Sequence, residues 1–111
     1  MSDYLFLRKN DRHVKIKTGD IQFIEAAGSY LKVNTITEQF SLAQNLSQFE
    51  RKNPIRALVR VHRSFMVNFD LVDSFDNGHV YIGEIQIPIG PSFRNNFLKS
   101  VSSSVPIDDL E

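Results

Sequence analysis

Several polar side chains stand where a loop meets a strand or where a helix begins, and loops of this kind often carry binding residues. They are Ser29, Tyr30, Lys32, Arg63, Ser64, Arg94 and Asn95. An arginine can bond O6 and N7 of guanine with two hydrogen bonds, and an asparagine can read adenine. Serine and lysine side chains, together with the amides of a helix N-terminus, suit phosphate oxygens. Composition and spacing alone therefore allow nucleic-acid binding but do not favour it over other functions.

Other chemistry finds little support in the chain. It has no cysteine, so it has no thiolate nucleophile and no disulfide. His13, His62 and His79 are scattered, without the spacing of a zinc site. No esterase elbow and no phosphate-binding glycine loop of the Walker type occurs. We expect no catalytic site, no metal site and no cofactor.

The length of 111 residues predicts a single domain, and 41% hydrophobic residues are typical of a globular one. The net charge is zero, but residues 1–63 carry 11 Lys/Arg against 6 Asp/Glu, whereas residues 64–111 carry 2 against 7. A partner feels the local field, so the total does not exclude an anionic ligand. The apolar runs are far shorter than the roughly 20 residues that cross a bilayer, and no signal peptide is recognisable. We expect no membrane association and a cytoplasmic location.

Short apolar segments alternate with turn signals, which predicts an all-β domain. The expected strands are Tyr4–Arg8, Val14–Ile16, Ile21–Ala26, Tyr30–Thr35, Gln39–Phe40, Leu58–Val61, Phe65–Val67, Val72–Phe75, His79–Ile82 and Ile85–Ile89. Asn10-Asp11 and Asp76-Asn77-Gly78 between them are strong turn signals.

Two helices are predicted as well. Ser41 stands three residues before Gln44, as in a capping box, and Leu42, Leu46 and Phe49 follow at helical spacing. Asn53-Pro54 ends this helix. Gly90-Pro91-Ser92 opens the second helix, whose apolar stripe is Phe93, Phe97, Leu98 and Val101. A single helical turn is expected at Asn68–Leu71, with Asn68 as its cap.

Three ordered motifs resemble a known family. They are IQFIEAAGSYLKV at residues 21–33, RVHRSFMVN at 60–68 and IPIGPSFR at 87–94. Together they are similar to the LytTR domain, the DNA-binding output domain of many bacterial response regulators, over roughly Tyr4 to Val101. Residues 1–3 are then an N-terminal extension, and residues 102–111 an acidic tail that we expect to be disordered.

The resemblance implies an elongated, mostly antiparallel fold of short strands with one or two helices. It also implies sequence-specific binding to double-stranded promoter DNA, with loops rather than a recognition helix in the major groove. Family members typically bind paired repeats, often as dimers, behind a phosphorylated receiver domain controlled by a sensor kinase. No receiver is present here, so we expect either an excised output domain of a response regulator or a stand-alone LytTR protein. The positions carried over from the family are Ser29, Tyr30, Arg63, Ser64, Ser92, Arg94 and Asn95. Arg63 and Arg94 are expected at base edges, and Ser64 and Ser92 at phosphates.

Neighbouring residues have plainer interpretations. We expect a structural hydrogen bond for His62, a capping role for Asn68 and a partly buried ring for Tyr30. Glu25 would repel phosphate, so a surface or structural role is expected. Arg60 is either a phosphate contact or a solvated charge. The near-neutral total charge also favours an alternative function, a protein-interaction module on the same fold without DNA readout.

Overall fold

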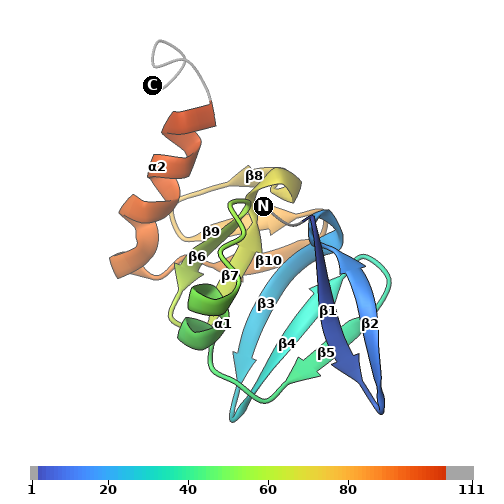
Figure 1. Ribbon diagram of the computed structural model, residues 1–111. Coiled ribbons are helices and arrows are strands. Elements are labelled where there is room, and N and C mark those ends of the chain that lie inside the picture. Colours follow the sequence, from blue (N-terminus) through green and yellow to red (C-terminus); the bar gives the residue numbers. More distant parts are fainter. Residues whose placement is uncertain (1–2, 105–111) are drawn as a thin grey trace.

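A computed structural model describes residues 3–104 of the chain, which form ten strands and two α-helices (Figure 1). The molecule extends 50 Å along its longest axis and 27 Å along the other two. All strand pairs are antiparallel. The predicted elongated, all-β architecture is therefore confirmed.

A five-stranded sheet forms the centre of the molecule. Its order is β5 (Gln39–Leu42), β4 (Tyr30–Thr35), β3 (Ile21–Ala27), β7 (Phe65–Asn68) and β6 (Leu58–His62). Residues that alternate along β3, β6 and β7 point to opposite faces, and both faces are covered. Thus Leu58 belongs to one hydrophobic core, whereas Val59 and Val61 belong to the other.

The first core lies between this sheet, the β1–β2 hairpin and helix α1. Strands β1 (Tyr4–Lys9) and β2 (Arg12–Lys17) form a separate two-stranded sheet, and β1 contacts β5. Helix α1 (Leu46–Lys52) buries Leu46 and Phe49 in this core. The tight turn of the hairpin places Asn10 at a φ of 59°, a left-handed conformation that asparagine tolerates.

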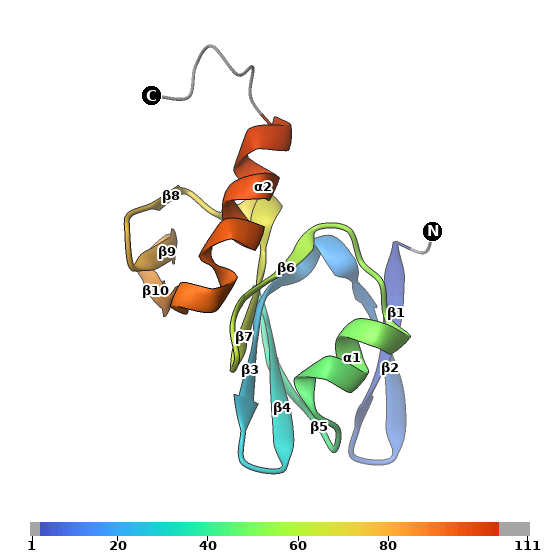
Figure 2. The ribbon, with the colours of Figure 1, turned by 90° about the vertical axis from the view of Figure 1, so that its left-hand side faces the viewer.

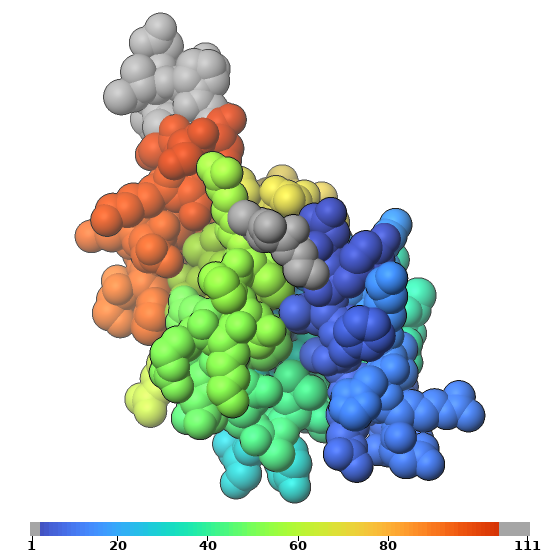
Figure 3. Space-filling model, viewed as in Figure 1, coloured from blue at the N-terminus to red at the C-terminus, as the bar shows by residue number. Residues whose placement is uncertain are grey.

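The second core lies on the other face. It is covered by a three-stranded sheet of β8 (Ser74–Phe75), β9 (His79–Ile82) and β10 (Ile85–Pro88), and by helix α2 (Arg94–Ser104). Phe97 of α2 is fully buried there, with its ring 5.9 Å from that of Phe69. In the space-filling view the β1–β2 hairpin and α2 lie on opposite sides of the green α1 region (Figure 3).

The start of helix α1 was predicted wrongly. Ser41 and Leu42 belong to β5, where they pair with Lys32 and Leu31 of β4. The helix begins four residues later, and its capping box is formed by Asn45 and Gln48 (2.8 and 2.9 Å). Two consecutive capping patterns are present in the sequence, Ser41 with Gln44 and Asn45 with Gln48, and pairing of β5 with β4 excludes the first.

Two other boundaries also differ from the prediction. Val72 closes the short helix η2 (Phe69–Leu71) by donating to the carbonyl of Phe69, so β8 begins only at Ser74. The second helix opens with a 3-10 turn, η3 (Pro91–Phe93), and continues to Ser104, so Ser102–Ser104 of the expected tail are helical. The rest of that tail, residues 105–111, lies outside the described residues.

The capping box allows a direct test of the corrected helix start. Asn45→Ala removes the acceptor for the Gln48 amide and should lower the free energy of unfolding by about 1 kcal/mol. Ser41→Ala is the matched control, because Ser41 is exposed on β5 and should change stability by less than about 0.5 kcal/mol. Urea denaturation of the two variants gives both values. A larger loss of stability for Ser41→Ala than for Asn45→Ala would contradict the corrected helix start and favour Ser41 as the cap.

Candidate nucleic-acid interface

The β3–β4 loop presents the first pair of predicted contact residues. Ala27 pairs with Tyr30, so the loop contains only Gly28 and Ser29. Gly28 takes a φ of +63°, as the first position of a type II′ hairpin turn requires. Ser29 is exposed, and Tyr30 as a whole residue is 55% exposed, so it is only partly buried. Both side chains can reach a ligand.

The β6–β7 turn presents Arg63 and Ser64. Arg63 is exposed, and its guanidinium has no hydrogen-bond or ion-pair partner within residues 3–104. The backbone of Ser64 is held on both sides: its N–H donates to Nδ1 of His62 at 3.1 Å, and its carbonyl accepts from the N–H of Ala26 at 2.8 Å. The second bond joins this turn to the end of β3, next to the β3–β4 loop.

The start of α2 lies beside the same turn. The N–H of Gly90 donates to the carbonyl of Val61 at 2.8 Å. A Cβ at Gly90 would lie 3.4 Å from Cδ2 of His62, so the two segments are closely packed. Ser92 and Asn95 are exposed on this helix start. Figure 2 shows the β3–β4 loop, the β6–β7 turn and the first turn of α2 along one side of the molecule.

Arg94 is partly occupied by an internal contact that the sequence did not indicate. Its Nη1 donates to the carbonyl of Asn77 at 2.5 Å and lies 3.4 Å from that of Asp76. Both carbonyls belong to the β8–β9 hairpin. The side chain is half-buried, and a guanidinium has further N–H groups that these bonds do not use.

That hairpin is ordered by the carboxylate of Asp76. Oδ1 accepts from the backbone N–H of Gly78 and of His79, and Oδ2 accepts from the Tyr81 hydroxyl at 2.6 Å. The bond from Tyr81 is the main reason why the pKa of Asp76 lies below its ordinary value, and the Gly78 amide adds to it. The same bond raises the pKa of Tyr81. Asp76 thus shapes the loop that holds Arg94.

Three neighbouring residues have structural roles. His62 bonds Ser64, as expected, and its ring meets the Phe65 ring edge-on with centroids 5.6 Å apart. Asn68 is 1% exposed; it accepts from the N–H of Asp70 and donates to the carbonyl of Ile21 at 2.8 Å. Glu25 lies opposite Lys32 in the β3–β4 ladder. The expected structural hydrogen bond of His62 and the capping role of Asn68 are both confirmed.

The structure contradicts one of the two interpretations of Arg60, the solvated charge. Its side chain is only 14% exposed, and its three guanidinium nitrogens all have partners within the protein. It is therefore not a solvated charge. A guanidinium has five N–H groups and these bonds use three of them, so a phosphate contact by Arg60 stays a prediction.

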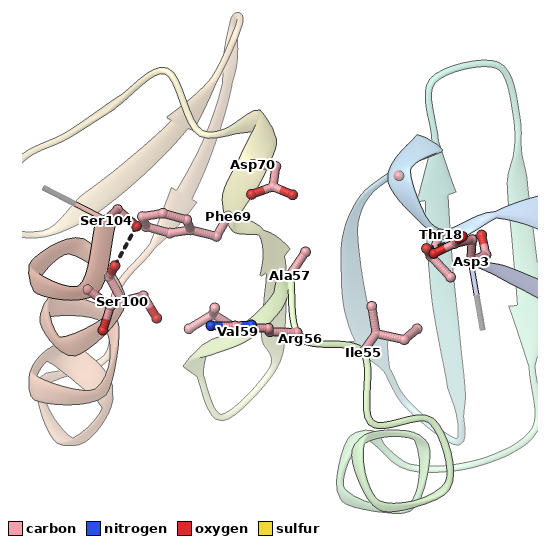
Figure 4. A pocket seen from close by; sticks show the side chains of 12 residues that line it. Asp3, Thr18, Ile55, Arg56, Ala57, Val59, Phe69, Asp70, Ser100 and Ser104 are labelled. Carbon is pink, nitrogen blue, oxygen red and sulfur yellow. Dashed lines mark hydrogen bonds between the residues drawn. The ribbon is translucent and has the colours of Figure 1, made fainter. Parts of the chain in front are cut away.

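One surface hollow lies away from all seven predicted contact residues. It is a groove of about 470 Å³, with Asp3 and Thr18 at one side and Ser100 and Ser104 of α2 at the other (Figure 4). No set of three or more potential metal ligands gathers anywhere in residues 3–104. None of the helices in that range is long and apolar enough to span a membrane.

The fold and the aligned loops define a β-rich binding domain that presents polar side chains along one side. Comparison with known proteins identifies the family to which this domain belongs. The family model described as the LytTr DNA-binding domain matches residues 11–102, and the chain belongs to this family. A solved LytTr DNA-binding domain from Bacillus cereus has the same fold, with a TM-score of 0.77 and 19% sequence identity over 92% of this chain and 99% of that chain. No curated protein sequence matches the chain.

The Asp76–Tyr81 bond predicts a pH-dependent contribution to stability. Because the pKa of Asp76 is lower in the folded protein, the bond stabilises the fold above the unfolded value, near pH 4, and its contribution falls as Asp76 takes up a proton. Tyr81→Phe removes only the hydroxyl. The difference in free energy of unfolding between wild type and variant should be constant from about pH 5 to pH 7 and shrink below about pH 4. Urea melts at each pH measure it, and a difference that grows on acidification would contradict the assignment.

Proposed function

We propose that this domain binds specific duplex DNA in a transcriptional regulator and reads the major groove through its loops. The observation that carries the proposal is the alignment of three polar segments along one side of a LytTR domain. These segments are the β3–β4 loop, the β6–β7 turn and the start of α2. Loops on a rigid sheet are suited to entering a groove because their backbones are fixed at both ends.

The individual contacts follow from the chemistry of each side chain. Arg63 is exposed and unpaired within the described residues, so it is the best candidate for a bidentate bond to guanine. Arg94 can use the N–H groups that Asn77 leaves unoccupied. Ser64 and Ser92 are assigned to phosphate oxygens. Ser29 and Tyr30 on the β3–β4 loop and Asn95 at the start of α2 are the remaining proposed DNA contacts.

The wider biological role belongs to the same proposal. The Bacillus cereus structure is assigned to a response regulator, and such a role would place this domain in a bacterial two-component system in the cytoplasm. A receiver domain or a sensor-kinase pathway would then control it, and paired DNA repeats would bind it as a dimer.

A second function is motivated by the charge balance. With 13 basic and 13 acidic side chains, the chain lacks the excess positive charge of many DNA-binding domains. A protein-interaction module on this fold would need no such charge. The two functions differ in salt dependence, because every phosphate contact releases counterions and steepens the fall of affinity with salt.

Selection of bound duplexes from a randomised DNA pool tests the proposal. The selected duplex is then titrated at two salt concentrations. We expect enrichment of a short motif, repeated about one helical turn apart, and an affinity that falls steeply with salt. No enrichment at low salt by folded protein would favour the protein-interaction module.

Substitution of the two arginines tests the contact assignment. Arg63→Ala and Arg94→Ala should each weaken binding to the selected duplex by about 1–3 kcal/mol and relax its specificity. Arg63→Ala should leave the free energy of unfolding unchanged, since the side chain has no partner among residues 3–104. Arg94→Ala also removes the bonds to the β8–β9 hairpin and should lower stability slightly.

Lys17→Ala is the control for general loss of charge. Lys17 is exposed on β2. Figure 2 shows β2 on the side of the molecule away from the three segments. The Lys17→Ala substitution should weaken binding to every duplex by less than about twofold, because screened charges beyond a Debye length contribute little. Normal binding by both arginine variants would refute the assignment.

A further inference from the structure

Each of the three guanidinium nitrogens of Arg60 has a partner within the protein. Nε donates to the carbonyl of His62 at 2.8 Å, and Nη2 donates to the carbonyl of Arg63 at 2.6 Å. Nη1 lies 3.3 Å from Oε1 of Glu50 on α1. Two of these bonds end on the backbone of the β6–β7 turn, so the guanidinium fixes the segment that carries Arg63.

The ladder between β6 and β7 is interrupted at this point. Arg60 pairs with Met66 and His62 pairs with Phe65, which leaves a register shift between Arg60 and His62. A bulge redirects the chain and leaves backbone groups without ladder partners. The guanidinium supplies donors to two carbonyls there, which stabilises the bent conformation of the turn.

Arg60 also contacts the start of α2. Its guanidinium carbon lies 5.4 Å from the centroid of the Phe93 ring, within the range of a cation–π interaction. The Arg60 carbonyl accepts from Nδ2 of Asn96 at 3.3 Å. One residue therefore joins the β6–β7 turn to the helix start that carries Ser92, Arg94 and Asn95.

We propose that Arg60 is a positioning residue for DNA recognition. It holds the β6–β7 turn and the start of α2 as one unit and acts through Arg63, without touching DNA. This inference rests on the proposed function for its effect on binding. Its structural half, the fixing of the turn, can be tested without DNA.

The geometry needs an arginine rather than any cation. A guanidinium is planar, donates in several fixed directions and can stack on a ring at the same time. A lysine keeps the charge but has a single nitrogen, which cannot reach both carbonyls with the same geometry. Arg60→Lys is therefore the informative variant, and Arg60→Gln removes the charge as well.

The first experiment measures the free protein. Hydrogen exchange of the backbone amides is compared in wild type, Arg60→Lys and Arg60→Gln, after circular dichroism has shown that each is folded. We expect the amides of Ser64 and Phe65 to exchange at least about tenfold faster in both variants, while those of β3 and β4 are unchanged, because local opening is confined to the released turn.

Glu50→Gln is the matched control. Glu50 is 47% exposed on its side chain, so its loss should change these rates little. Unchanged exchange at the turn in both Arg60 variants would overturn the proposal.

The second experiment is a double-mutant cycle on the selected duplex. Arg60→Lys should lower affinity for that duplex about fivefold to tenfold and leave affinity for an unrelated duplex unchanged. In the Arg63→Ala background it should cost less than about twofold, because coupled residues are not additive. Additive losses, or equal weakening on the unrelated duplex, would show that Arg60 acts independently or contacts phosphate, and would overturn the proposal.

The two experiments separate the possible failures. If wild type binds no duplex, the proposed function fails and the role of Arg60 in recognition fails with it. The exchange rates still decide whether Arg60 holds the turn. If wild type binds DNA and the cycle is additive, the proposed function stands and only the positioning role is rejected.

Discussion

The structure depends on burial of both faces of strands β3, β6 and β7. Neighbouring residues on these strands belong to different cores, as Leu58 and Val59 do on β6, and Met66 and Val67 on β7. A shift of one residue in the pairing would exchange the two sets and place side chains selected for one core into the other. The register is therefore strongly specified. It fixes the β6–β7 turn between the two halves of the molecule, next to the end of β3 on one side and the start of α2 on the other.

This arrangement explains how a small domain with a short-stranded fold can hold three loops in a fixed relation. Each loop is tied by backbone bonds to a buried strand or to its neighbour, through Ala26 with Ser64 and through Gly90 with Val61. Side-chain contacts then complete the surface: Arg60 binds the turn, and the β8–β9 hairpin binds Arg94. For a DNA-binding domain such pre-organisation has a clear use, because flexible loops would lose conformational entropy on binding. A net charge of zero is also compatible with DNA binding, because the local placement of the cations matters more than their total.

Much of the architecture could be predicted from the sequence. Strand positions followed from apolar alternation, and the turns at Asn10 and Asn77 followed from residue type, because both signals are local. The start of α1 could not be predicted, because Ser41 and Asn45 offer equivalent capping patterns and only the pairing of β5 with β4 distinguishes them. The contacts of Arg60 were missed for a similar reason. Its partners Glu50, Phe93 and Asn96 are distant in sequence, and no local pattern distinguishes a buried guanidinium from a solvated one. The contact of Arg94 with Asn77 is likewise a product of tertiary packing, whereas the exposure of Ser29, Ser92 and Asn95 followed from their place in loops and at a helix start.

Mapping of the bound surface tests the central claim most directly. The isotope-labelled domain is titrated with a duplex selected from a random pool, and the shifts of its backbone amides are followed by NMR. We expect the largest changes at residues 28–30, 62–65 and 92–95, with little change along the exposed β2 strand of the β1–β2 hairpin. Changes concentrated on that hairpin or on α1, with the three segments unaffected, would contradict the account.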